Sequence, residues 1–166
     1  MNLVKTAILL SCAALFLLLP GCATSPEDAA RRAEAEADID EIMSYELDPD
    51  EYGEAKDCLG SHEYDNFRPL GDRHILFEDR RGKLWVNTLR ARCRALQHGD
   101  VLVVKQSTGR RMCDTDRFEA TDLFDYPAGG ISSNWGTGGS CLLGDFHPVT
   151  EAQVAEIEAV LESLER

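Results

Sequence analysis

Residues 74–89 read HILFEDRRGKLWVNTL, and this stretch contains the pattern that decides the fold. Two short runs rich in apolar residues, 74–77 and 84–89, flank residues 80–83, which include Gly82. Runs of this length with a glycine-containing turn between them are typical of a β-hairpin. We therefore predict two antiparallel strands here.

A second hairpin and a helix follow along the chain. Residues 101–106 and 111–118 flank residues 107–110, which we also interpret as two strands around a turn. A helix is expected from about Glu151 to Leu164, because Thr150 and Gln153 form a capping box at its start. Strands followed by a helix predict an α+β domain with a small antiparallel sheet of about four strands. The helix packs on this sheet through one apolar stripe, formed by Val154, Ile157, Leu161 and Leu164.

Charge divides the chain into two regions. The net charge is −13, which argues against nucleic-acid binding because phosphate recognition requires a basic surface. Residues 23–57 contain thirteen acidic and three basic residues, whereas the chain from Cys58 onward contains seventeen acidic and thirteen basic residues. We predict an acidic, partly helical spacer over residues 22–57 and a folded domain over residues 58–166.

The spacer carries a helix start signal. Ser25 suits the N-cap and Pro26 the first helical position, while alanine, glutamate and arginine favour the helix that follows. The simplest interpretation is a solvated spacer, and residues 48–55 resemble a hinge or turn. The alternative is a helix that binds a partner through four larger apolar residues, namely Ile39, Ile42, Met43 and Leu47.

Residues 1–21 have the layout of a secretory signal. Lys5 precedes an apolar stretch of thirteen residues, 7–19, and small residues follow it. A membrane-spanning helix needs about twenty apolar residues, so we predict an export signal instead. The segment Leu19-Pro20-Gly21-Cys22 resembles a bacterial lipobox, which implies cleavage before Cys22 and lipid on that cysteine. An ordinary signal-peptidase cut after Ala23 is the alternative.

Four cysteines lie beyond Cys22, an even number that suits an oxidising compartment. Zinc sites usually contain closely spaced cysteine pairs, whereas 19 to 34 residues lie between successive cysteines here. We therefore predict two disulfides rather than a zinc site, with three connectivities open. The cysteines are Cys58, Cys93, Cys113 and Cys141.

Short motifs in a fixed order resemble a known family. They are Cys58-Leu59, residues 72–77, residues 86–89 followed by Cys93, residues 112–116 and residues 141–150. Together they resemble a domain-of-unknown-function family of small lipoproteins from Gram-negative bacteria. The resemblance implies a lipid-anchored, periplasm-facing protein, and Ala23 after the lipobox cysteine implies the outer membrane. It implies no activity.

Other candidate sites have ordinary structural explanations. The acidic residues Asp114, Asp116, Glu119 and Asp122 lack the glycine and the final glutamate of a calcium-binding loop. The histidines His62, His74, His98 and His147 form no metal-binding or nucleophile motif.

Residues 80–117 contain ten basic and three acidic residues, which indicates either a solvated sheet face or a surface for an anionic partner. Residues 127–140, with Trp135, lack the ending of a phosphate-binding loop.

The sequence favours a non-enzymatic binding or structural module of the cell envelope. We expect no cofactor, no resident metal and no catalytic residue. The expected partners are the membrane, through lipid on Cys22, and a periplasmic protein or anionic envelope material. Two alternatives stay open: an envelope hydrolase whose site is assembled from separated residues, and a periplasmic metal-handling protein.

Overall fold

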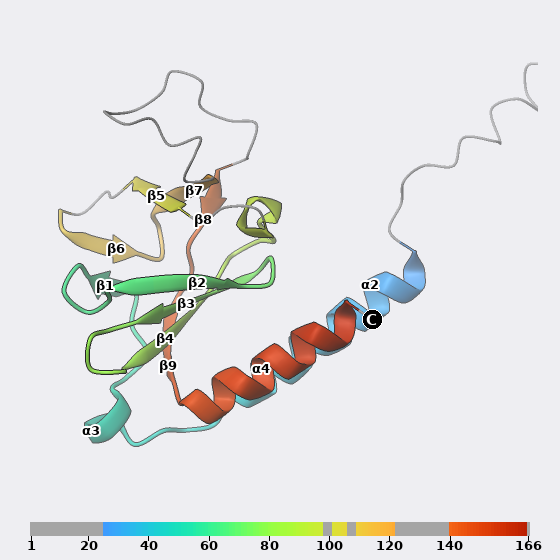
Figure 1. The fold of residues 1–166 in the computed structure, drawn as a ribbon, viewed down its shortest axis with the longest axis horizontal. Helices are drawn as coiled ribbons and strands as arrows, with labels where there is room; N and C mark the ends of the chain where they lie inside the picture. Colours follow the sequence, from blue (N-terminus) through green and yellow to red (C-terminus); the bar gives the residue numbers. More distant parts are fainter. Residues whose placement is uncertain (1–24, 98–100, 106–108, 122–139, 166) are drawn as a thin grey trace, which may run out of the picture. The chain divides into compact units, whose positions relative to one another are not determined.

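The computed structural model describes residues 25–97, 101–105, 109–121 and 140–165 (Figure 1). The chain divides into two compact units, Met1–Glu34 and Ala35–Arg166. The described residues of the first unit form the start of helix α2 (Pro26–Met43), where the Asp28 amide donates to the Ser25 hydroxyl over 3.0 Å. This bond confirms the predicted N-cap.

The main sheet has four antiparallel strands in the order β2-β3-β4-β9. Strands β3 (His74–Glu78) and β4 (Leu84–Thr88) form the predicted hairpin, with Phe77 opposite Trp85. Gly82 in their turn has a φ of +79°, a backbone conformation that glycine adopts without a steric penalty. β2 (Asn66–Leu70) pairs with β3 and β9 (Phe146–Val149) with β4.

The predicted second hairpin is wrong in its pairing. Strand β5 (Val101–Lys105) pairs with β7 (Arg117–Thr121), which also pairs with β8 (Cys141–Leu142). Strand β6 (Arg111–Cys113) pairs instead with β1 (Cys58–Gly60). A tight turn separates β6 from β7, because the Asp116 carboxylate accepts from the Cys113 amide over 2.8 Å and the Asp116 amide donates to the Cys113 carbonyl over 2.9 Å.

The predicted C-terminal helix is confirmed as α4 (Glu151–Leu164), which starts at the Thr150–Gln153 capping box. Two short helical turns complete the described elements: α3 (Pro49–Tyr52), where a hinge or turn was expected, and the 3-10 turn η2 (Arg94–Gln97). Within the described residues, no helix is both long and apolar enough to cross a membrane.

The main sheet separates two hydrophobic cores. One face packs against β1, β6, β7 and η2 around a core of large residues, which include Ile75, Phe77, Trp85, Phe118 and Phe146. The opposite face is covered by α4 and by the part of α2 from Ala35 onward (Figure 1). This second core contains Ile39, Leu70, Leu76, Val86, Val149, Val154 and Ile157, with Ile42, Met43 and Leu161 packed against it.

Three of the four candidate spacer anchors therefore contact the domain, namely Ile39, Ile42 and Met43. A hydrogen bond fixes the two helices to each other, since the Gln153 amide nitrogen donates to the Ile42 carbonyl over 2.8 Å. The fold is α+β, as predicted, with antiparallel sheets and a C-terminal helix that packs on both the sheet and α2.

Candidate functional site

Two disulfides join segments that are far apart in the sequence. Cys58 on β1 bonds to Cys113, its directly opposite residue on β6, across a separation of 55 residues. Cys93, just before η2, bonds to Cys141 on β8 across a separation of 48 residues. Of the three connectivities that the sequence left open, the structure has this one. Paired thiols persist in oxidising compartments, so the disulfides indicate an extracytoplasmic domain.

The acidic and histidine candidates do not gather into a metal site. Among the described residues, no group of three or more His, Cys, Asp or Glu side chains is arranged to hold a metal ion. Asp116 is buried and ties the turn after β6, while Asp114 forms an ion pair with Arg90 at 2.6 Å. His62 is exposed, whereas His74 is 2% exposed on β3 and His147 lies on β9. Asp122 and His98 lie outside the described residues.

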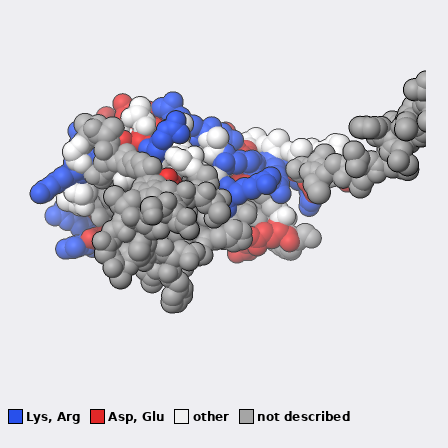
Figure 2. Space-filling model, turned by 90° about the horizontal axis from the view of Figure 1, so that it is seen from above, with Lys and Arg blue, Asp and Glu red and all other residues white. Residues whose placement is uncertain are grey.

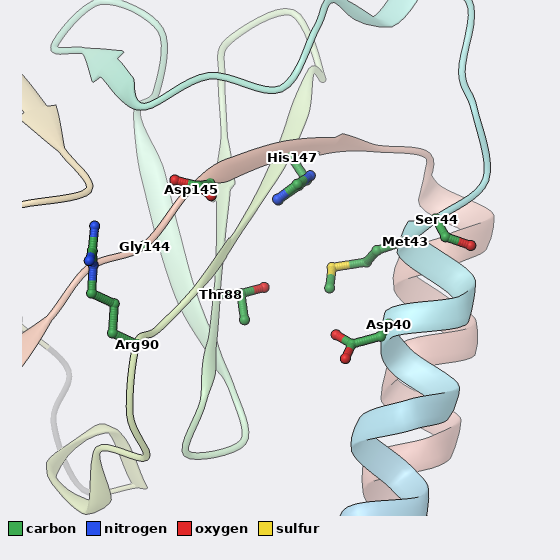
Figure 3. Close-up of a pocket in the computed structure, with 8 residues that line it drawn as sticks. All are labelled: Asp40, Met43, Ser44, Thr88, Arg90, Gly144, Asp145 and His147. Atoms are coloured by element: carbon green, nitrogen blue, oxygen red, sulfur yellow. The ribbon is translucent and has the colours of Figure 1, made fainter.

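A cavity of about 540 Å³ lies between α2 and the end of the main sheet (Figure 3). In the close-up, Asp40 and Met43 on α2 face Thr88 on β4 and His147 on β9. The volume of the cavity falls within the range of small-molecule sites, about 300–1,000 Å³. The remaining lining residues are Ser44, Arg90, Gly144 and Asp145.

One wall of the cavity is held rigidly by the backbone around Gly144. The Asn87 side chain donates to the Gly144 carbonyl over 2.5 Å and accepts from the Gly144 amide over 3.1 Å. A Cβ at Gly144 would lie 2.0 Å from the Thr88 carbonyl oxygen, so no other residue fits without backbone movement. Asn87 is fully buried, and its amide therefore fixes β4 against the segment that leads into β9.

Several polar groups at the cavity have no hydrogen-bond or ion-pair partner among the described residues. The buried Thr88 hydroxyl oxygen forms no hydrogen bond with any described residue. Asp40 and Asp145 are both exposed at the cavity, and neither forms an ion pair within the described part of the chain. Buried polar groups normally have partners, and an unpartnered one calls for an explanation.

His74 is the strand neighbour of Thr88, a residue that lines this cavity. It is opposite Thr88 across the β3–β4 pair and on the same face of the sheet. Burial lowers the pKa of His74 to about 4, and the positive charge of Arg73 acts in the same direction, while Asp40 and Asp72 oppose it. The imidazole is therefore neutral at physiological pH.

The basic residues of the domain are partly neutralised by its own acids. Arg92 pairs with Glu36 of α2 at 2.7 Å and with Asp72 at 3.0 Å, and Arg73 also pairs with Glu36. Arg80 pairs with Asp65 at 2.8 Å. Figure 2 shows acidic side chains next to lysines and arginines over one face of the molecule. A solvated face partly screened by acids, including one from α2, accounts for these arginines.

Sequence reasoning did not find the cavity. Asp40, Thr88 and Asp145 come from a helix, a strand and a connecting segment, and no local motif joins them. Two features singled out from the sequence, Cys22 and the glycine-rich stretch 127–140 with Trp135, lie wholly or almost wholly outside the described residues.

Comparison with known proteins gives a family but no activity. The model of a family of unknown function, DUF6491, matches residues 5–160. No curated protein matches the chain, and no solved structure matches it either.

Proposed function

Since the chain belongs to DUF6491, a family of unknown function, we propose from its residues that it is a lipid-anchored binding module of the bacterial cell envelope. One observation carries the proposal: a domain with two disulfides follows a signal-like segment that ends in a lipobox-like cysteine. The domain then faces the periplasm and binds a ligand or partner there.

The anchor is Cys22. Export delivers the chain to the compartment in which its disulfides form. A diacylglyceryl thioether on Cys22 and an acyl group on its amino nitrogen supply several fatty chains, which anchor firmly where one chain binds only marginally. The acidic surface is not attracted to anionic headgroups, so the lipid supplies the membrane attachment. Ala23 favours the outer membrane as the destination.

Binding rather than catalysis is supported by the cavity. A nucleophilic hydroxyl is normally activated by a hydrogen bond to a general base. The Thr88 hydroxyl has no such bond among the described residues. The cavity is held at its Gly144 wall by Asn87 and carries polar groups with no partner in the described part of the chain, which suits recognition.

A hydrolase is the second candidate. It is favoured by the position of neutral His74 opposite Thr88, with Asp40 close enough to affect the His74 pKa. Covalent labelling of Thr88 by a fluorophosphonate, located by peptide mass spectrometry, would favour this candidate over the binding module.

Intact mass of the chain extracted from its native membrane tests the anchor. We expect loss of residues 1–21, the added mass of lipid on Cys22, and a gain of four hydrogen masses on reduction of two disulfides. The matched control is Cys22→Ser, which removes one thiol and leaves the four disulfide cysteines in place. A wild-type product that begins at Thr24 and lacks lipid would overturn the anchor.

A further inference from the structure

We infer that the side of the domain opposite its helices faces the membrane and binds the phosphates of anionic lipid headgroups through Arg94, Arg111 and Arg117. These three residues are called the basic face below. The inference deepens the proposed function and rests on it, because a domain tethered by lipid at Cys22 stays within reach of the bilayer. It names a partner for the arginines and an orientation for the domain.

The three arginines lie on the elements that cover the first core. Each of β6, β7 and η2 buries an apolar side chain in this core, and the arginines are exposed residues of the same elements. Arg111 and Arg117 each precede a buried strand residue, and successive strand side chains point to opposite sides, so both point away from the core. η2 packs against β7, which places Arg94 and Arg117 on neighbouring elements. Figure 2 views the domain from the side of β5, β7 and β8, and lysines and arginines predominate there among the coloured residues.

The basic face is not neutralised by the described acids. None of its three arginines forms an ion pair within the part of the chain that the structure describes. Two acids close to it in the sequence are engaged elsewhere, since Asp114 pairs with Arg90 and Asp116 is buried in the turn after β6. The three positive charges are therefore available to a partner outside the chain.

The helices on the opposite side of the main sheet have the opposite charge. Ala35–Met43 of α2 and the whole of α4 each contain four acidic residues and no lysine or arginine. An anionic surface therefore attracts one side of the domain and repels the other. Because the net charge of −13 opposes adsorption of the whole chain, the basic face orients a domain that the lipid already holds.

The chemistry of the basic face favours lipid phosphate over a protein partner. The planar guanidinium group of arginine binds phosphate oxygens in a bidentate manner. Protein interfaces depend on large anchor side chains that become buried, and among the described residues the exposed large apolar side chain is Tyr45, which follows α2. A tether raises the effective concentration of the headgroups, so weak contacts suffice, and each arginine near an anionic surface contributes about fivefold.

Arginine footprinting on vesicles tests the basic face. The lipidated chain is reconstituted in phosphatidylcholine vesicles, with or without phosphatidylglycerol, and treated with phenylglyoxal, an uncharged reagent that modifies arginine. Peptide mass spectrometry is expected to show about fivefold slower reaction at Arg94, Arg111 and Arg117 on the anionic vesicles, and high salt should remove the difference. Arg68, which is exposed and pairs with Glu158 of α4, is the internal control and should react equally on both.

A variant with a matched control shows whether the arginines act together. Arg94→Gln removes one exposed charge from the basic face and should weaken the protection of Arg111 and Arg117 on anionic vesicles. Arg68→Gln removes one exposed charge from the side of the helices and should leave the protection unchanged.

Three results would overturn the inference: equal reaction of the basic face on both vesicles, an equal change at Arg68, or undiminished protection in Arg94→Gln. Equal protection on neutral vesicles by added polyglutamate would also overturn it, because an acidic protein would then be the partner.

The same experiment separates the basic face from the anchor. A lipidated chain without protection refutes the basic face and leaves the anchor intact. If the chain carries no lipid, the anchor fails, and Thr24→Cys coupled to a maleimide-bearing lipid supplies a tether at the same end. Protection of the three arginines in that variant keeps the basic face, and its absence overturns both proposals.

Discussion

His74 has a pKa far below the ordinary value of a histidine side chain. It is 2% exposed and lies opposite Thr88 on the neighbouring strand, and burial lowers its pKa to about 4 from an ordinary value of 6.5. Arg73 and Arg92 also lower this pKa, while the carboxylates of Asp40 and Asp72 raise it. Burial outweighs both carboxylates, so the folded protein holds this histidine neutral.

This shift predicts that stability falls on acidification. The unfolded chain binds a proton at His74 below pH 6.5, whereas the folded chain does so only near pH 4. The associated stability is therefore fully present above pH 6.5 and is lost as the pH falls to about 4. A shift of this size corresponds to about 3 kcal/mol. Urea unfolding of wild type and His74→Gln across this pH range should show a shallower pH dependence in the variant.

The prediction concerns the slope of the free energy of unfolding against pH. A variant that is less stable at every pH therefore still tests it. His74→Leu provides a second, non-titrating replacement if His74→Gln folds poorly. His62→Gln is the matched control, because His62 is exposed and its replacement should preserve the wild-type slope. Parallel curves for wild type and both His74 variants would show that His74 does not cause the acid sensitivity.

At the scale of elements, one side chain of α4, Gln153, forms hydrogen bonds at the start of its own helix and at the end of α2. The Gln153 side-chain oxygen accepts from the Thr150 amide over 2.9 Å, and its nitrogen donates to the Ile42 carbonyl over 2.8 Å. Ile42 is the penultimate residue of α2, and the last four carbonyls of a helix have no partner within it. Gln153 therefore caps the start of one helix and the end of another.

Replacement of Gln153 should loosen both helices. Gln153→Ala removes three side-chain hydrogen bonds, two from Thr150 and one to Ile42, and is expected to reduce the free energy of unfolding by about 1–2 kcal/mol. Gln153→Glu keeps the oxygen that accepts from Thr150 but replaces the donor to Ile42, so it separates the two roles. Hydrogen exchange should become faster at the end of α2 in both variants, and faster at the start of α4 only in Gln153→Ala. Unchanged exchange at Ile42 and its neighbours would show that Gln153 does not secure α2.

Elements with strong local signals could be predicted from the sequence, and elements defined by distant pairing could not. The β3–β4 hairpin and the Thr150 cap depend on residues that are close in sequence. By contrast, β6 leaves its sequence neighbour β7 and pairs with β1, because the Asp116 turn interrupts the strand and Cys58 bonds to Cys113. The cavity could not be predicted for the same reason, because its polar side chains lie on α2, on β4 and on the segment before β9, which are far apart in the sequence.

At the scale of the whole molecule, one disulfide cross-links the two strands of the β1–β6 sheet, and the other joins β8 to the segment before η2. They close loops with separations of 55 and 48 residues. Cys93 lies inside the first loop and Cys141 outside it, so the loops interleave. Each loop alone corresponds to about 4 kcal/mol of lost chain entropy in the unfolded state. Because each bond already shortens the path closed by the other, their joint contribution is somewhat less than the sum.

Removal of both disulfides should bring the domain close to its unfolding threshold. Single domains have a stability of about 5–15 kcal/mol, and a joint loss of several kcal/mol is a large part of it. The paired replacements Cys58→Ser with Cys113→Ser and Cys93→Ser with Cys141→Ser should each lower the urea midpoint. Because each bond contributes less while the other is present, the fourfold variant should lose more stability than the two pair variants combined. Reduction of the wild type should reproduce the fourfold variant, and an unchanged midpoint after reduction, with four free thiols counted by mass, would show that the fold does not depend on its cross-links.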